Sequence, residues 1–153
     1  MEFIKRASDY AIRSLIYMAC FSNGKVFDIS SIAKKVSVPP VFLHKIFQKL
    51  CKANVLTSHK GVRGGFSLRK SSAKITVKEI IGIVQGPLLL NKCFQGDDLC
   101  ARLAICSFKK RLNVLQKDFT YFFNKLTLKD LAEDEKIFVN NKGVKWWKER
   151  MVS

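Results

Sequence analysis

Residues 39–66 read PPVFLHKIFQKLCKANVLTSHKGVRGGF, and this stretch decides the fold. In its first half, apolar residues recur at steps of three and four, which predicts a helix after the two prolines. The inward face of that helix would consist of Phe42, Leu43, Ile46, Phe47 and Leu50. The outward face would be basic or amide-bearing, and its members are His44, Lys45, Gln48, Lys49 and Lys52. Asn54 is expected to end the helix in left-handed backbone geometry.

A shorter helix is expected directly before this one. Asp28 is a suitable N-cap for it, and Ser37 and Val38 break its apolar pattern. Two helices joined by a tight turn, the second with a basic face, are typical of a helix-turn-helix whose second helix reads DNA. The alternative is a charged face that is only solvated. The candidate DNA contacts on the second helix are Pro40, Phe42, His44, Lys45, Gln48 and Lys49.

The second half of the stretch predicts a β-hairpin. Residues 56–59 and 66–69 alternate in polarity like strands, and the KGVRGG between them supplies the glycines of a tight turn. We interpret this hairpin as the wing of a winged helix-turn-helix. Lys60 and Arg63 at its tip are candidate contacts to phosphates or to a narrow minor groove. Gly64 would let the backbone approach DNA closely.

Further helices are predicted on both sides of this unit. Residues 8–20 show the spacing of an amphipathic first helix. Thr76 to Glu79 reads as a capping box, which predicts a helix that ends before Gly86 and Pro87. Residues 87–100 lack periodicity and are expected to form a loop.

The most regular pattern lies between residues 101 and 126. Apolar residues there follow the alternating spacing of a heptad seam, which predicts one helix of about 26 residues and about 39 Å. A small winged domain does not cover such a helix alone, so we expect a homodimer. Burial against the first helix of the same chain is the alternative, and both can hold together. The candidate dimerisation residues are Ile105, Phe108, Leu112, Leu115, Phe119 and Phe122.

The expected fold class is therefore mainly α: a winged helix-turn-helix, which is an α+β unit, with a long dimerisation helix. The expected division is a DNA-binding domain at 1–86, a cysteine-containing loop at 87–100, a dimerisation region at 101–132 and a tail at 133–153. Trp146 and Trp147 in the tail are expected to dock on the body of the protein.

The charge favours a polyanionic partner. The chain carries 28 Lys and Arg against 12 Asp and Glu, a net charge of +16, and residues 1–84 account for +11 of it. Double-stranded DNA is the leading candidate. No apolar run reaches the roughly 20 residues that a membrane span needs, and the first ten residues lack the apolar stretch of a secretory signal. A cytoplasmic protein without membrane contact is expected.

Three cysteines, Cys93, Cys100 and Cys106, lie within 14 residues. Their spacing fits neither the close pairs of zinc fingers nor the tight runs of bacterial ferredoxins. Thiolates are nevertheless soft ligands that suit an iron–sulfur cluster or zinc, and a carboxylate or an exogenous ligand would complete the site. The alternative is three buried or incidental thiols. Cys20 and Cys51 are expected to be small core residues.

Several landmarks coincide with these predictions: SDYAIR at residues 8–13, PPVFLHKIF at 39–47, KGVRGGF at 60–66 and the three clustered cysteines. In order and spacing they resemble the Rrf2 family of bacterial transcription regulators over residues 2–132. The resemblance implies a homodimer of winged helix-turn-helix domains with long crossed helices. It also implies a pseudo-palindromic DNA operator as the partner.

The same resemblance implies a set of cluster ligands. Cys93, Cys100 and Cys106 match the family's cluster cysteines, for a cluster of two irons or four, although the first gap here holds six residues where IscR and NsrR have five. Lys109 stands where IscR has a ligating histidine. Asp9 matches the aspartate that NsrR-like members take from the partner subunit. A helix-cap or first-turn carboxylate is the alternative role for Asp9.

The leading functional hypothesis is an iron–sulfur repressor that senses nitric oxide, iron or redox state. A cluster-free regulator of the CymR kind, controlled by thiols or by a partner protein, is the sibling hypothesis. An electron-transfer or cluster-carrier protein is the hypothesis from another class. An enzyme is not expected, because the sequence offers no nucleophile–base pair and no phosphate-binding glycine loop.

Overall fold

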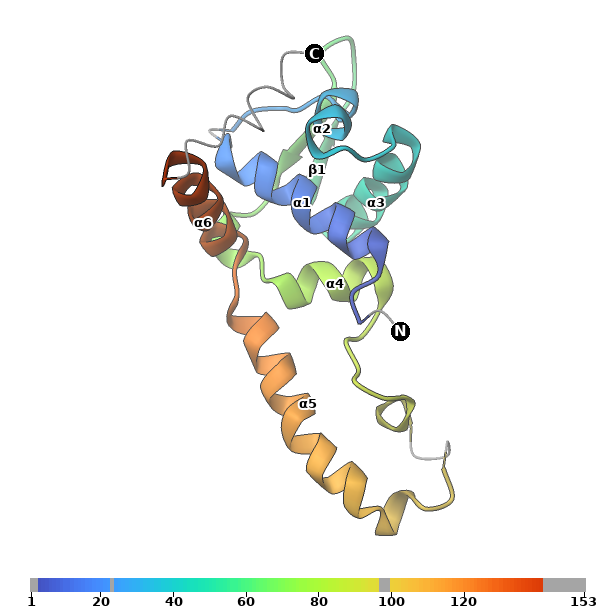
Figure 1. The fold of residues 1–153 in the computed structure, drawn as a ribbon. Coiled ribbons are helices and arrows are strands. Elements are labelled where there is room, and N and C mark those ends of the chain that lie inside the picture. Colours follow the sequence, from blue (N-terminus) through green and yellow to red (C-terminus); the bar gives the residue numbers. More distant parts are fainter. Residues whose placement is uncertain (1–2, 23, 97–99, 142–153) are drawn as a thin grey trace.

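A computed structural model describes residues 3–22, 24–96 and 100–141. It confirms the predicted class, a mainly helical winged helix-turn-helix (Figure 1). The helices are α1 (Arg6–Cys20), α2 (Ile29–Val36), α3 (Pro40–Lys52), α4 (Val77–Gln85), α5 (Ser107–Lys125) and α6 (Leu128–Asn141). The strands are β1 (Leu56–His59) and β2 (Gly65–Leu68), and short 3-10 turns are η1 (Ser72–Lys74), η2 (Lys92–Phe94) and η4 (Leu103–Ile105).

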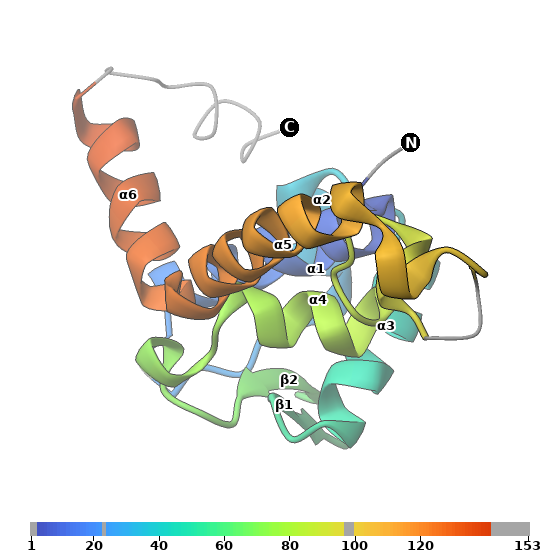
Figure 2. The same ribbon diagram turned by 90° about the horizontal axis from the view of Figure 1, so that it is seen from below.

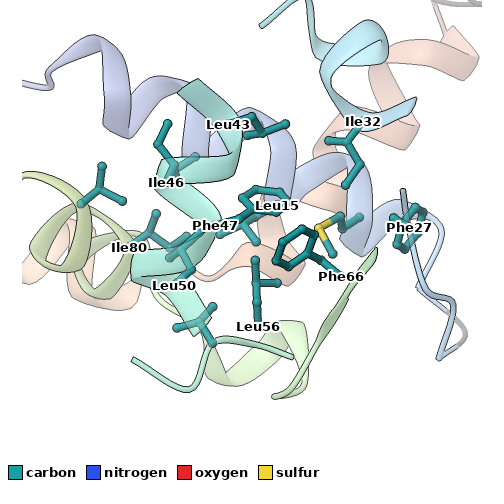
Figure 3. Close-up of a cluster of buried hydrophobic side chains, with 14 of the residues drawn as sticks. Leu15, Phe27, Ile32, Leu43, Ile46, Phe47, Leu50, Leu56, Phe66 and Ile80 are labelled. Carbon is teal, nitrogen blue, oxygen red and sulfur yellow. The ribbon is translucent and has the colours of Figure 1, made fainter. Parts of the chain in front are cut away.

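Helix α1 is the centre of the winged unit. It packs against α2, α3, α4 and α6, so four helices share one hydrophobic core around it. Leu15 of α1, Phe47 and Leu50 of α3 and Ile80 of α4 are completely or almost completely buried in this core (Figure 3). Full burial of side chains of this size contributes about 1.5–3 kcal/mol each.

The predicted helix boundaries around the helix-turn-helix are confirmed. The Asp28 carboxylate accepts hydrogen bonds from the backbone N–H groups of Ser30 (3.2 Å) and Ser31 (2.8 Å) and so caps α2. Hydrogen bonds from Ser31 lower the pKa of this carboxyl group. Ser37 (φ 56°) and Asn54 (φ 59°) have left-handed backbone conformations directly after α2 and shortly after α3. The side chain of Thr76 accepts from the Glu79 N–H at 3.1 Å, which is the predicted N-cap of α4.

The wing is a two-stranded antiparallel sheet in which Leu56 pairs with Leu68 and His59 pairs with Gly65. Phe27 extends it by one residue, because its backbone exchanges two hydrogen bonds of 2.8 Å with Phe66. The Phe66 ring packs edge-on against Phe47, with ring centroids 5.1 Å apart. The hairpin is thereby fixed to both α3 and the residue that precedes the α2 cap.

The long helix is shorter than predicted. It begins at Ser107 rather than at Ala101, because Cys106 caps it: the Cys106 Sγ accepts a hydrogen bond from the Lys109 N–H at 3.3 Å. Ile105 therefore lies in η4, before the helix, and is not part of a helical seam. The 19 residues of α5 span about 28 Å.

The C-terminal region contains a helix that the sequence pattern did not predict. α6 packs against α1, and its Leu128 and Ala132 are buried. The predicted division at residue 132 falls inside this helix. Trp146 and Trp147 lie outside the described residues.

Candidate functional site

The outer edge of α3 is the first candidate surface. Leu43, Ile46, Phe47 and Leu50 pack into the core and leave the opposite edge of the helix in solvent. Pro40 begins the helix, where a proline costs no backbone hydrogen bond. The exposed residues along this edge are Pro40, Val41, Phe42, His44, Lys45, Gln48 and Lys49.

Phe42 does not have the inward position predicted for it. The residue is 60% exposed, and the hydrophobic cluster includes its neighbour Leu43 but not Phe42. The first turn of α3 therefore extends past the core. Phe42 remains among the candidate DNA contacts as an exposed aromatic side chain at the leading end of the helix.

The tip of the hairpin is the second candidate surface. Lys60, Val62 and Arg63 are exposed there. Gly61 has a φ of 104°, which side chains rarely tolerate, and the Gly64 N–H bonds to the Gly61 carbonyl at 2.9 Å. A Cβ atom on Gly64 would lie 2.5 Å from the His59 carbonyl oxygen. The structure thus gives Gly64 an intramolecular role in the turn. We define the reading surface as Pro40, Phe42, His44, Lys45 and Gln48 of α3 together with Lys60 and Arg63 of the hairpin.

Some predicted contacts have other partners within the chain. The Lys49 ammonium donates to the Val84 carbonyl oxygen at 3.0 Å, which ties α3 to the end of α4. The His44 ring lies edge-on to Phe66 at 6.2 Å, and His59 hydrogen-bonds to Ser67 across the hairpin at 2.8 Å. The ammonium of Lys49 is therefore directed to α4, and we leave it out of the reading surface.

A further charge signal in the sequence supports this surface. Residues 29–78, which include α2, α3 and the wing, contain no Asp or Glu. The basic residues in the same span are Lys34, Lys35, Lys45, Lys49, Lys52, Lys60, Arg63, Arg69, Lys70, Lys74 and Lys78. A span without acidic side chains has nothing to repel phosphates, so its positive field favours nucleic acid.

The third candidate site is an open pocket at the start of α5. Its volume is about 500 Å³, and its lining includes Cys93, Cys106, Lys109 and Lys110. Two of the three clustered cysteines therefore face one space, although twelve residues separate them in the sequence. The two lysines in the lining would balance the negative charge of bound thiolates.

The remaining predicted ligands lie elsewhere. Cys100 is exposed and does not line the pocket. Among the described residues, no group of three His, Cys, Asp or Glu side chains is close enough to hold a metal ion. Asp9 lies in the first turn of α1 and forms an ion pair with Arg13, four residues later. The first-turn role that was the alternative for Asp9 is thus present in the single chain.

Cys20 and Cys51 are separate from this site. Both are half-buried at the core, and burial raises the pKa of each thiol. The Cys20 thiol also contacts the Ala132 carbonyl oxygen of α6 at 3.6 Å. Cys51 packs against the hydrophobic core as predicted, whereas the contact given for Cys20 is this polar one with α6.

An apolar stripe on α5 is the last candidate site. The apolar residues of the predicted seam lie on two different faces of α5. Phe119 is on the inner face, where its ring packs against Phe3 and Phe123. The same cluster contains Val77 and Ile81 of α4. α5 therefore docks mainly on α4, and Ile12 of α1 belongs to the same hydrophobic cluster. Its other face remains exposed and carries Phe108, Val114, Leu115, Tyr121 and Phe122, which we define as the exposed stripe. Figure 1 shows α5 extending away from the winged unit. In the view of Figure 2, α4 lies between α5 on one side and the β1–β2 hairpin on the other.

Comparison with known proteins connects these features. The model of the Rrf2 family, described as "Iron-dependent Transcriptional regulator", matches residues 4–134. The chain belongs to the Rrf2 family. A relative from Aquifex aeolicus (strain VF5), named "Putative HTH-type transcriptional regulator", is 33% identical over 128 residues, which cover 82% of this chain and 88% of the relative.

Two solved structures share the fold of this Rrf2 chain. CymR, the global cysteine regulator of B. subtilis, superposes with a TM-score of 0.73 at 20% identity and covers 87% of this chain and 98% of its own. IscR of T. potens superposes with a TM-score of 0.70 at 20% identity over 86% of this chain and 87% of its own. The family match and the Aquifex relative show that the Rrf2 chain is a helix-turn-helix transcription regulator, and the family and these neighbours are transcription regulators, not enzymes. In the part that the structure describes, no helix is both long and apolar enough to cross a bilayer.

The family description implies iron, and the donor set of this Rrf2 chain fits an iron–sulfur group. Cys93 and Cys106 line one pocket with two lysines, and sulfur is the ligand type that such groups require. Cys100 lies only six residues before Cys106 and is exposed. Among the described residues the structure therefore brings two of the three thiols, those of Cys93 and Cys106, to one pocket, and it does not bring Cys100 to them.

Proposed function

We propose that this Rrf2 regulator is a homodimeric iron–sulfur repressor that binds a pseudo-palindromic DNA site and senses nitric oxide, iron or redox state. The observation that carries the proposal is the shared pocket of Cys93 and Cys106 at the start of α5. That pocket adjoins the helix that carries the exposed stripe. A change at the thiols would therefore act directly on the helix that joins two subunits.

DNA recognition would use the reading surface. α3 would enter the major groove with its N-terminal residues leading, where His44, Lys45 and Gln48 face base edges and phosphates. Lys60 and Arg63 on the hairpin would contact phosphates or the adjacent minor groove. The absence of acidic residues in 29–78 supports contact between this part of the chain and the phosphates of DNA.

Dimerisation would bury the exposed stripe. Phe108, Leu115 and Phe122 are seven residues apart, and so are Val114 and Tyr121, which is the repeat of a helix packed on another helix. Leu115 and Phe122 are 54% and 59% exposed in the single chain. Two α5 helices packed face to face would cover both rows and place two α3 helices on one side of the dimer.

The cluster would be held by Cys93, Cys100 and Cys106, with Asp9 of the partner subunit as the proposed fourth ligand. An iron–sulfur group supplies a redox-active iron site that oxygen or nitric oxide attacks. The part played by the chain is to hold the thiols together and to shield them. If Asp9 leaves Arg13 to serve the partner's site, the first helix of each subunit becomes linked to the cluster of the other.

The cluster proposal is tested by purification without air, followed by iron, sulfide and visible-absorption measurements. We expect bound iron and sulfide in the wild type and none in the variant Cys93→Ser/Cys100→Ser/Cys106→Ser. A colourless, iron-free wild type would contradict the cluster proposal.

The DNA proposal is tested by the salt dependence of operator binding. Arg63→Ala should flatten the slope of log K against log salt by about 0.9 for each phosphate that the side chain no longer neutralises, and so by about 1.8 for a dimer. Lys129→Ala on α6 removes the same charge away from the reading surface and should leave the slope unchanged. Equal slopes in all three proteins would contradict the role of the wing.

The dimer proposal is tested by light scattering. Leu115→Glu places a carboxylate in the exposed stripe and should give a monomer. Lys117→Glu places it on the same helix outside the stripe and should leave the dimer intact. A dimeric Leu115→Glu variant would place the interface elsewhere.

A second candidate function is a cluster-free regulator controlled by thiol oxidation. Cys100 is exposed and outside the pocket, and the described residues contain no group of three metal-ligating side chains, which favours this function. The fold is also shared with CymR of Staphylococcus aureus in an oxidized form, with a TM-score of 0.67. Operator binding by the iron-free protein that changes reversibly with peroxide and dithiothreitol would support this function over the first.

A further inference from the structure

Gln116 of α5 has a buried polar side chain. Its amide forms hydrogen bonds with the segment 88–90 and with Thr120 of its own helix. Its exposure is 9%. Its Oε1 accepts from the Leu90 N–H at 2.8 Å, while its Nε2 donates to the Leu88 carbonyl at 2.9 Å and to the Thr120 hydroxyl at 3.0 Å. One amide thus binds both a backbone donor and a backbone acceptor of the segment 88–90.

This segment leads directly to the first cysteine of the pocket. It follows the end of α4, and only two residues separate Leu90 from Cys93. Gln116 lies ten residues after Cys106 on the other side of the same site. The amide therefore attaches the segment that carries Cys93 to the helix that Cys106 caps.

Hydrophobic packing alone would not fix this attachment at one position. Leu88 is buried beside Val77 and Ile81, which holds the segment near α5 and α4. Apolar contact is non-directional, so it permits the segment to slide along the helix. The two hydrogen bonds between the Gln116 amide and the segment form only when residues 88–90 have one register along α5. In any other register a buried backbone N–H or carbonyl group of the segment would lose its hydrogen-bond partner, which costs free energy.

We propose that Gln116 is the positioning residue for Cys93: it fixes the register of residues 88–90 on α5, so that the thiols of Cys93 and Cys106 reach the same ligand. This proposal rests on the proposed cluster, but the register itself is a property of the metal-free chain. Its test therefore has one measurement without iron and one with it.

The metal-free test uses a fluorogenic crosslinker that joins only neighbouring thiols. In a full-length chain with Cys20, Cys51 and Cys100 replaced by serine, we expect rapid crosslinking of Cys93 to Cys106. Gln116→Met keeps the length and apolar volume of the side chain but loses all three hydrogen bonds. The crosslinking rate should fall about 30-fold, the change in population expected when two ordinary hydrogen bonds to the segment are removed.

The matched control is Phe123→Leu, which weakens the packing of α5 on α4 about two turns further along the helix. It should lower thermal stability while leaving the crosslinking rate near that of the parent protein. Should Gln116→Met not fold, Gln116→Glu retains the acceptor for Leu90 and loses the donor to Leu88, and it should give an intermediate rate.

The second measurement is the visible absorption of the reconstituted cluster under chelator challenge. Gln116→Met should lose its cluster about 30-fold faster than the wild type, because the same two hydrogen bonds are missing. Unchanged crosslinking in Gln116→Met, or an equal decrease in Phe123→Leu, would overturn the positioning role. A wild type that crosslinks rapidly but binds no iron would instead contradict the proposed function and leave the register of Cys93 confirmed.

Discussion

Gly65 offers a sharp test of how the wing is attached to the rest of the protein. A Cβ atom at this position would lie 2.3 Å from the Phe27 carbonyl oxygen and 2.8 Å from its carbonyl carbon. Both neighbours are backbone atoms, so no side chain can rotate away. Gly65→Ala must therefore separate Phe27 from Phe66 and break their two backbone hydrogen bonds.

The expected loss of stability follows from the two hydrogen bonds between Phe27 and Phe66. At a net value of about 1 kcal/mol each, Gly65→Ala should lower the free energy of unfolding by about 2 kcal/mol and the melting temperature by about 4–8 °C. Gly82→Ala is the matched control, because nothing lies within 4 Å of its added methyl group in the middle of α4. The same chemical change there should stabilise the protein by about 0.5–1 kcal/mol.

Both variants and the wild type should be compared by thermal and urea denaturation at one protein concentration, since a dimer's stability depends on concentration. Below its melting temperature, Gly65→Ala should also bind DNA more weakly, because the displaced hairpin carries Lys60 and Arg63. Melting temperatures that shift in the same direction for both variants, or a Gly65→Ala protein as stable as the wild type, would refute the close contact between the wing and Phe27.

Three further predictions concern the α2 cap, the cysteines and the leading end of α3. Asp28→Ala should cost about 1 kcal/mol at pH 7. Hydrogen bonding lowers the pKa of Asp28 in the folded protein. The stabilisation by this carboxylate is therefore fully present at a pH above the pKa that Asp28 has in the unfolded chain, and it is lost as the pH falls through the pKa in the folded protein. In acid denaturation, the free energies of unfolding of the wild type and Asp28→Ala should therefore become equal. In timed alkylation at pH 8, read by mass spectrometry, Cys100 should react before Cys20 and Cys51, since it is exposed while burial raises the pKa of the other two. Phe42→Ala should weaken operator binding. If the Phe42 ring contacts a thymine methyl group, replacing thymine by uracil in the half-site should lower the DNA affinity of the variant less than that of the wild type. An equal loss of affinity in both proteins would argue against that contact.

Local signals were enough to predict the winged unit. The Asp28 cap, the left-handed Asn54, the Thr76 cap and the glycines of the hairpin act through neighbouring residues, so the sequence displays them directly. Periodicity likewise identified the core residues of α3 from Leu43 onward. It misplaced Phe42, because the pattern does not reveal where the core ends along a helix.

The long helix was predicted less well for a physical reason. The apolar spacing continues through Ala101 and Ile105, but Cys106 takes the N-cap position and starts α5 after them. The seam residues also lie on two faces of α5, because Phe119 contacts α4 while Leu115 is exposed. The spacing of apolar residues in the sequence does not distinguish these two faces. α6 was missed because only a few of its residues, such as Leu128 and Ala132, are buried.

The cysteine site was predicted only as a set of residues. Spacing alone indicated three thiols, whereas the shared pocket of Cys93 and Cys106 depends on contacts between distant segments. Gln116 is the clearest example of what the sequence conceals. A glutamine within an apolar helical pattern reads as a surface residue, and only the hydrogen bonds with Leu88 and Leu90 identify its role.

The junction between α5 and α6 has a consequence for the geometry of operators. Residues 75–77 and 126–128 pair through a bridge, in which the Val77 N–H donates to the Leu126 carbonyl at 2.9 Å and the Leu128 N–H donates to the Ile75 carbonyl at 2.8 Å. This joint anchors one end of α5 to the body that carries α3. In the proposed dimer, α5 would act as a rigid arm whose length sets the separation of the two α3 helices and whose rotational phase sets their relative orientation. Insertion of seven residues into the arm would add about 10.5 Å and nearly preserve that phase, whereas insertion of two would turn the partner by about 200°. If the proposed dimer forms through α5, its length would set the separation of the two half-sites, and related proteins with a longer or shorter α5 should recognise half-sites with different separations.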